Sequence, residues 1–86
     1  IDGTSFKGAD LSGFDFSPHD PRADISFLPR NFCRGCRFDG ATLRGANFDD
    51  ASLAMASFAG ANLSGARLTR TDLSRVDFTG ADLTGA

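Results

Sequence analysis

Two cysteines, one histidine and a series of aspartates are the residues of this chain that could do chemistry. Cys33 and Cys36 have the Cys-X-X-Cys spacing found in zinc sites and in thioredoxin-like redox centres. A zinc site needs two further ligands, and His19 is the sole histidine, while a thioredoxin-like centre needs a βαβ setting that the sequence lacks. The pair is therefore interpreted as two small buried apolar side chains, with a disulfide or redox role as the alternative.

The remaining titratable residues form no catalytic set. His19 has no serine or cysteine beside it that would make a nucleophile pair, so it is expected in a solvent-exposed loop. Regularly spaced aspartates are predicted to point outward or to accept hydrogen bonds from turn backbone. We expect no enzyme, no metal site and no cofactor. These aspartates are Asp10, Asp72, Asp77 and Asp82.

The cysteines and aspartates lie within a five-residue repeat, which determines where their side chains are placed. From Cys36 to Ala86 a large apolar residue, here called the centre, returns at every fifth position, and a small or apolar residue, the minus-two residue, stands two places before it. A helix repeats about every 3.6 residues and a half-buried strand about every 2, so a period of five requires a turn in every unit. The predicted core consists of the centres Phe38, Leu43, Phe48, Leu53, Phe58, Leu63, Leu68, Leu73, Phe78 and Leu83.

Residues twenty positions apart indicate four sides per turn of the chain. Phe38, Phe58 and Phe78 form one column, and leucines form the next, so like residues stack on like. Each turn would pair with its neighbours at the normal strand spacing of about 4.8 Å. The predicted fold is therefore all-β: a solenoid of about four square coils with five residues per side.

The corners between sides fall into two groups. Glycine, as at Gly40, ends two of the four sides and supplies the positive φ of a type II turn. The other corners carry Asp50 and Arg70, or Met55 and Arg75, and we expect there a different turn that tolerates side chains. Asp50 should lie beneath Arg70 and form an ion pair worth at most about 1 kcal/mol.

The chain is predicted to be one domain with an interruption near its start. Phe16 and Phe38 are 22 positions apart, which exceeds four five-residue units by two and places an insertion between them. The prolines near His19 favour a loop there. The predicted parts of the domain 1–86 are first weak repeats at 1–16, a loop insertion at 17–24, irregular repeats at 25–35 and regular repeats at 36–86.

The repeats resemble the pentapeptide repeat family, whose motif reads Ala-(Asp/Asn)-Leu-X-X. The resemblance implies a right-handed quadrilateral β-helix without catalytic residues. Some members of that family bind type II topoisomerases such as gyrase by imitating DNA, and others belong to secreted bacterial effectors or multidomain proteins. The motif is visible at Ala9-Asp10-Leu11, Ala46-Asn47-Phe48, Ala61-Asn62-Leu63 and Ala81-Asp82-Leu83.

The net charge of −2 is nearly balanced, which argues against direct nucleic-acid binding, and no apolar run is long enough to span a membrane. We expect a non-catalytic interaction or scaffold module of a larger bacterial protein, bound to another protein or dimerised end to end. It would be cytoplasmic, or part of a secreted effector. The alternative is a DNA-mimicking topoisomerase binder that confers inhibitor resistance. Candidate partner-binding residues are His19, Asp20, Arg22, Arg37, Arg44, Arg67, Arg70 and Arg75.

Overall fold

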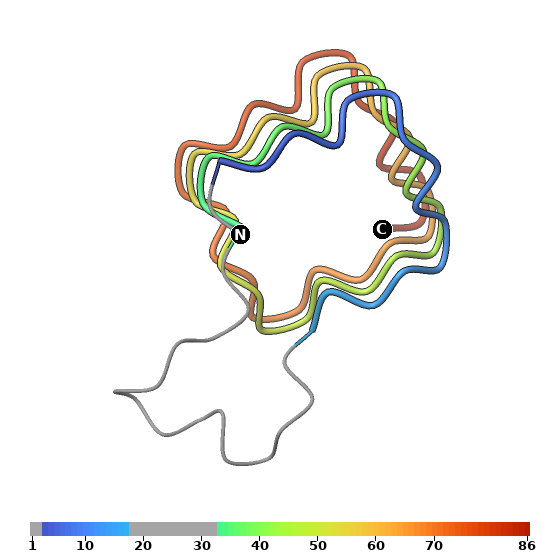
Figure 1. Ribbon diagram of the computed structural model, residues 1–86. Helices are drawn as coiled ribbons and strands as arrows, with labels where there is room; N and C mark the ends of the chain where they lie inside the picture. The colour runs from blue at the N-terminus through green and yellow to red at the C-terminus, as the bar shows by residue number, and fades with distance from the viewer. Residues whose placement is uncertain (1–2, 18–32) are drawn as a thin grey trace.

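A square coil in stacked turns is the architecture of residues 3–17 and 33–86, which the computed structural model describes (Figure 1). Successive turns pair through isolated parallel β-bridges, such as Arg37 with Ser57 and Ser57 with Asp77. The bridged residues lie twenty positions apart in the regular part of the chain, so the predicted four sides per turn are confirmed. Within the described ranges there is no helix, and thus none that could cross a membrane.

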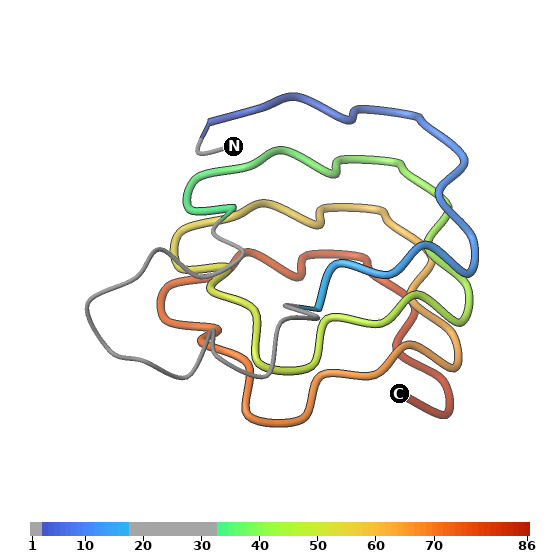
Figure 2. The same ribbon diagram turned by 60° about the horizontal axis from the view of Figure 1, so that its bottom comes forward.

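The four sides are named by the residues that form these bridges, in chain order. Figure 2 shows the turns lying one above another, so that each side is a column of short segments. Side one contains Ser5, Arg37, Ser57 and Asp77, side two Asp10, Thr42, Asn62 and Asp82, side three Asp15, Asn47 and Arg67, and side four Ser52 and Asp72.

Backbone hydrogen bonds join each turn to both neighbours. The centre Phe38 donates its N–H to the carbonyl of Ser57 in the next turn at 2.7 Å, and Ser57 donates its own N–H back to Cys36 at 2.9 Å. Within the turn, Ala41 donates to the carbonyl of Phe38 at 2.9 Å and closes the corner. This pattern satisfies the backbone of a five-residue side although the side is too short to form a regular strand.

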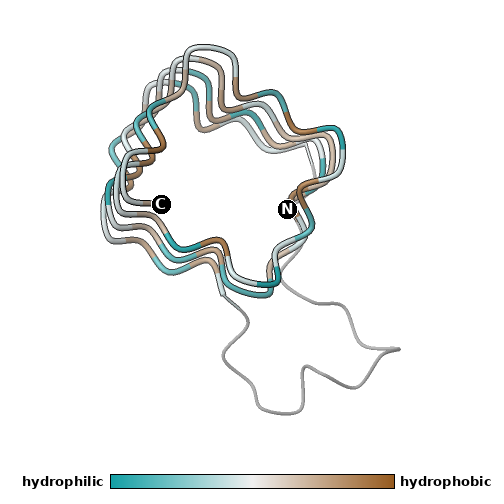
Figure 3. Ribbon diagram, turned by 180° about the vertical axis from the view of Figure 1, so that it is seen from behind, coloured by the Kyte–Doolittle hydropathy of each residue, from teal (hydrophilic) through white to brown (hydrophobic). Residues whose placement is uncertain are grey.

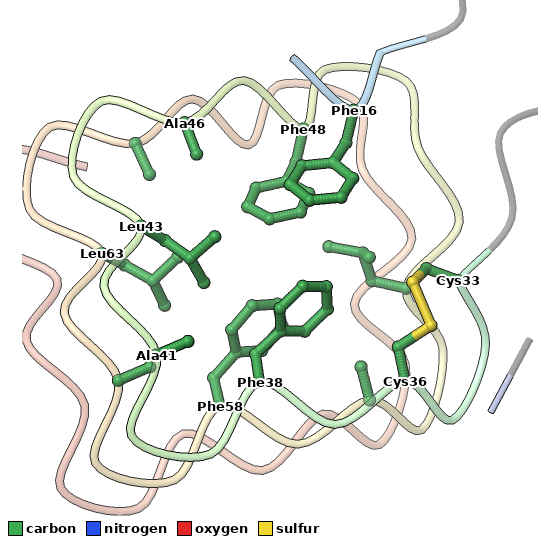
Figure 4. Packing of buried hydrophobic residues seen from close by; sticks show 14 of the residues in the cluster. Phe16, Cys33, Cys36, Phe38, Ala41, Leu43, Ala46, Phe48, Phe58 and Leu63 are labelled. Carbon is green, nitrogen blue, oxygen red and sulfur yellow. A yellow bond between two sulfur atoms is a disulfide. The ribbon is translucent and has the colours of Figure 1, made fainter. Parts of the chain in front are cut away.

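Phenylalanine and leucine centres fill the axis of the coil (Figure 4). The rings of Phe38 and Phe58 stack with centroids 4.8 Å apart and planes at 4°, and those of Phe16 and Phe48 at 4.6 Å and 5°. Rings of different columns meet edge to face, as Phe38 and Phe48 do at 82°. Polar and apolar residues alternate along every turn (Figure 3), as inward and outward positions require. The fully buried centres are Phe38, Leu43, Phe48, Leu53, Phe58 and Leu63.

The last four predicted core residues are less buried than expected. Leu68, Leu73 and Phe78 are partly buried and pack against the core, whereas Leu83 is 40% exposed. Leu83 lies in the final turn of the described residues, where no neighbouring turn covers one face of its side chain, so its place in the core stays a prediction. A hollow of about 580 Å³ opens over this turn beside Leu68 and Leu83.

The insertion in the first turn is longer than the sequence indicated. Ser5 pairs with Arg37 thirty-two positions away, where regular pairs are twenty apart, so the first turn contains twelve extra residues and not two. The error arose because Phe16 and Phe38 lie on different sides. Cys33 already occupies a regular centre, since its N–H donates to Ser52 in the next turn at 2.7 Å. Most of the predicted loop and of the irregular repeats falls on residues 18–32, outside the described ranges.

The prediction of two turn types is also wrong. Asp50, Met55, Arg70 and Arg75 have φ of 63°, 63°, 53° and 56°, close to the +67° of Gly40. The corner bond from Ala51 to the carbonyl of Phe48 has the same pattern as at the glycine corners. All these corners are thus the same left-handed turn, made with or without glycine.

Two opposite substitutions are expected to measure this backbone effect. Met55→Gly should raise the free energy of unfolding by about 0.5–1 kcal/mol. The left-handed region costs an L-residue about 1–2 kcal/mol, and part of the gain from removing this cost is offset because glycine loses more conformational entropy on folding. Gly60→Ala should lower it by about 1 kcal/mol through φ alone, because an added Cβ would meet nothing within 4 Å. Urea unfolding of both variants checks the pair, and equal shifts in the same direction would contradict it.

Candidate interaction surface on the fourth side

The two corners that bound side four carry side chains where the other described corners carry glycine. Asp50 and Arg70 follow side three, and Met55 and Arg75 follow side four, all at positive φ. The exception is the first corner after side four, which has a glycine, Gly35. A left-handed non-glycine residue is unfavourable by about 1–3 kcal/mol and marks a place where the side chain itself is needed. This bias separates side four from the rest of the surface.

The residues that flank the insertion lie on the same surface. The described part of the first turn ends at Ser17, directly after Phe16 on side three, and resumes at Cys33 on side four. The insertion therefore falls, along the sequence, between side three and side four, where Asp50 and Arg70 stand in the following turns. Segments added to a rigid scaffold are common carriers of binding function.

Asp50 and Arg70 form the predicted cross-turn ion pair. Arg70 donates from Nε to Asp50 Oδ1 at 2.7 Å and from Nη2 to Oδ2 at 3.2 Å. The hydrogen bond and the charge of Asp50 raise the pKa of the Arg70 guanidinium. The bidentate geometry fixes the direction of both side chains at this corner, although an exposed pair stabilises the fold little.

Asp49, which the sequence analysis did not single out, is a buried carboxylate at this corner. The residue is 6% exposed, and its Oδ1 accepts the N–H of Thr69 in the next turn at 2.9 Å. Its Oδ2 lies 2.6 Å from Nη2 of Arg67. The sequence feature that could have drawn attention to Asp49 is the pair of consecutive aspartates, Asp49-Asp50, that follows the centre Phe48. Asp49 thus ties side three of one turn to the corner of the next.

Met55 and Arg75 stand one above the other at the second corner of side four. The Met55 side chain is among the most exposed large apolar groups of the described residues, and the residue is 49% exposed. Arg75 makes no ion pair with any residue in the described ranges. An exposed thioether beside an uncompensated guanidinium is a combination suited to contact with another protein.

The predicted partner-binding residues that the structure describes do not form one surface. Arg70 and Arg75 stand at the corners of side four, and Arg67 of side three reaches Asp49 beside the first of them, whereas Arg37 pairs with Asp39 at 3.5 Å on side one. Arg44 lies at the corner after side two. The candidates outside the described residues are His19, Asp20 and Arg22.

The regularly spaced aspartates bind the turn backbone, as predicted. Asp77 Oδ1 accepts the N–H of Thr79 at 2.9 Å and its hydroxyl at 2.6 Å, and these two bonds hold the pKa of the Asp77 carboxyl below its ordinary value. Asp72 and Asp82 make the same contacts with the hydroxyl residue that follows. Among the described residues no group of three or more side chains could hold a metal ion.

Stability is expected to fall in acid because of these carboxylates. Since folding lowers the pKa of Asp77, its contribution is complete above the unfolded value of about 3.9 and is lost as pH falls through the folded value. Asp77→Asn should show less loss between pH 7 and pH 3 than the wild type, because Asn62 makes the same bonds without titrating. Urea midpoints at both pH values test this, and an unchanged pH dependence would contradict it.

Cys33 and Cys36 are 3% and 0% exposed, so their predicted burial is confirmed. They also form a disulfide, the outcome kept as the alternative in the sequence analysis. The bond joins a centre of side four to the minus-two residue of side one across a single corner (Figure 4).

Known proteins with this architecture share its repeat. The family model described as pentapeptide repeats, with eight copies, matches residues 33–70 and 51–86. The chain belongs to the pentapeptide repeat family, and the four-sided β-helix implied by the resemblance is its fold. No curated protein matches this chain.

Three solved pentapeptide repeat proteins illustrate the likeness. One from the thylakoid lumen of Arabidopsis thaliana is 37% identical, with a TM-score of 0.72 over 91% of this chain and 46% of its own. One from Nostoc is 25% identical, with a TM-score of 0.69 over 94% and 59%. HetL of Nostoc, involved in heterocyst differentiation regulation, is 28% identical, with a TM-score of 0.53 over 94% and 30%. The chain spans about half the length of the first two.

Proposed function

We propose that this chain is a non-catalytic module that binds another protein through side four and its two corners. The observation that carries the proposal is the left-handed backbone of Asp50, Met55, Arg70 and Arg75, where glycine would serve the fold better. Asp50 and Arg70 stand between side three and side four, and the insertion falls between the same two sides along the sequence. The module would act as part of a larger protein, as its coverage of the first solved relatives suggests.

A glycine substitution at these corners tests the proposal without harming the scaffold. Met55→Gly/Arg75→Gly removes both exposed side chains and leaves the residue that other corners carry at this position. Arg37→Ala/Arg44→Ala is the matched control, because it removes two exposed side chains from other sides.

The three proteins would serve as bait in extracts, with retained proteins quantified by mass spectrometry. We expect a partner that is held by the wild type and by the control variant and is lost from the corner variant. Retention by the corner variant, or equal loss from both variants, would refute side four as the binding surface.

The topoisomerase alternative has less support from the described surface. A DNA mimic needs a continuous acidic stripe, but the outward column of side one alternates among hydroxyl, arginine and aspartate. On side three Arg67 follows Asp15 and Asn47. Gyrase supercoiling measured with micromolar protein would separate this alternative from the proposed module.

A further inference from the structure

The Cys33–Cys36 disulfide occupies positions that need no sulfur for the fold. Cys33 is a centre and Cys36 a minus-two residue, and the same two positions of the next turn hold Leu53 and Ala56. The corner sequence Cys33-Arg34-Gly35-Cys36 also recurs ten residues later as Leu43-Arg44-Gly45-Ala46. A leucine and an alanine therefore suffice to build this corner.

The bond contributes little to holding the whole chain together. A disulfide restrains the unfolded state more when it closes a longer loop, and this one joins residues three apart. Its effect is concentrated on one corner, which is the corner directly after the twelve-residue insertion. The backbone there is held by hydrogen bonds from Cys33 to Ser52 at 2.7 Å and from Gly35 to Ala54 at 2.9 Å.

We propose that Cys33 and Cys36 are a reversible redox couple that locks the corner after side four, the first corner that the described chain makes after the insertion. A dithiol reductant transfers two electrons and two protons: the sulfur–sulfur bond breaks, two thiols form, and the reductant becomes a disulfide. The corner hydrogen bond from Cys36 to the carbonyl of Cys33, at 3.1 Å, keeps the thiols near each other for re-oxidation.

Reduction loosens this corner because the core around it is close-packed. Two unbonded sulfur atoms need more room than two bonded ones, and the sulfurs sit among fully buried side chains such as Phe38 and Leu53. The additional volume is relieved outward, at the Arg34-Gly35 corner that the two cysteines flank. This redox response does not rest on the proposed function, because it is a property of the chain without a partner.

Amide hydrogen exchange of the protein with and without dithiothreitol tests the couple. Mass spectrometry first verifies the gain of two hydrogen atoms. We expect exchange of the Cys33 and Gly35 amides to become about tenfold faster on reduction, while Gly45, in the matching Leu-Arg-Gly-Ala corner, keeps its rate. Re-oxidation should restore the slow rates.

The control variant is Cys33→Leu/Cys36→Ala, which turns the corner into a copy of residues 43–46. Its exchange rates should be slow and independent of dithiothreitol. Unchanged rates in the verified dithiol form would overturn the proposal, and so would a disulfide that is reduced only after the whole chain unfolds.

Discussion

Phe58→Ala is expected to lower the free energy of unfolding by about 3–5 kcal/mol, the largest effect of any substitution considered. The Phe58 side chain is 0% exposed and stacks between Phe38 at 4.8 Å and Phe78 at 5.5 Å. Its removal leaves a cavity in the middle of a column, and turns above and below cannot close it without breaking their backbone bonds. Urea unfolding followed by circular dichroism measures the loss.

Phe14→Ala provides the comparison for this core substitution. Phe14 is 50% exposed at the edge of the first turn, although its ring contacts Phe16 at 4.5 Å. We expect this variant to lose about 1 kcal/mol or less, since about half of the side chain is already in water. A loss as large as that of Phe58→Ala would mean that the cost of removing a ring does not follow its burial.

Asp49→Ala is expected to lower the free energy of unfolding by about 1–3 kcal/mol. The substitution leaves the Thr69 N–H without its acceptor at 2.9 Å and removes the carboxylate that lies 2.6 Å from Arg67. A bond between a carboxylate and a backbone N–H is charge-assisted, and this one links two turns. Thermal and urea unfolding measure the effect.

Asp49→Asn separates the hydrogen bond from the charge. The amide oxygen can still accept the Thr69 N–H, so we expect about half of the Asp49→Ala loss to be recovered. Asp50→Ala is a second control, because its exposed pair with Arg70 should be worth about 1 kcal/mol or less. If Asp50→Ala were the more damaging of the two, the buried carboxylate would not be the main tie at this corner.

The core was the part of the fold most open to prediction. The column of Phe38, Phe58 and Phe78 follows from a period of five and a repeat of twenty, both of which are local properties of the sequence. Burial of a centre also depends on the neighbouring turns, which periodicity alone does not supply, as the 40% exposure of Leu83 in the final described turn illustrates. The length of the insertion was missed for a related reason: it depends on which side Phe16 joins, as shown by the pairing of Asp15 with Asn47.

The candidate surface was predicted only in pieces. Asp50 and Arg70 were placed one above the other from their spacing, and the structure confirms their ion pair. Their left-handed backbone could not be inferred, because residue type favours an ordinary turn for a non-glycine residue and the stacked corners override that preference. Asp49 was missed because its burial depends on Thr69 and Arg67 in the next turn.

By itself, the sequence determined the four-sided coil, its phenylalanine and leucine columns and the outward polar positions, because each depends on residue spacing along the chain. Tertiary structure alone decided that the side-chain-bearing corners have left-handed backbone, how deeply Asp49 is buried, and that Cys33 bonds to Cys36. These features depend on contacts between turns, or on two side chains meeting across a corner. A period in the sequence specifies which residues point inward, but the stacking of turns sets the distances between their atoms.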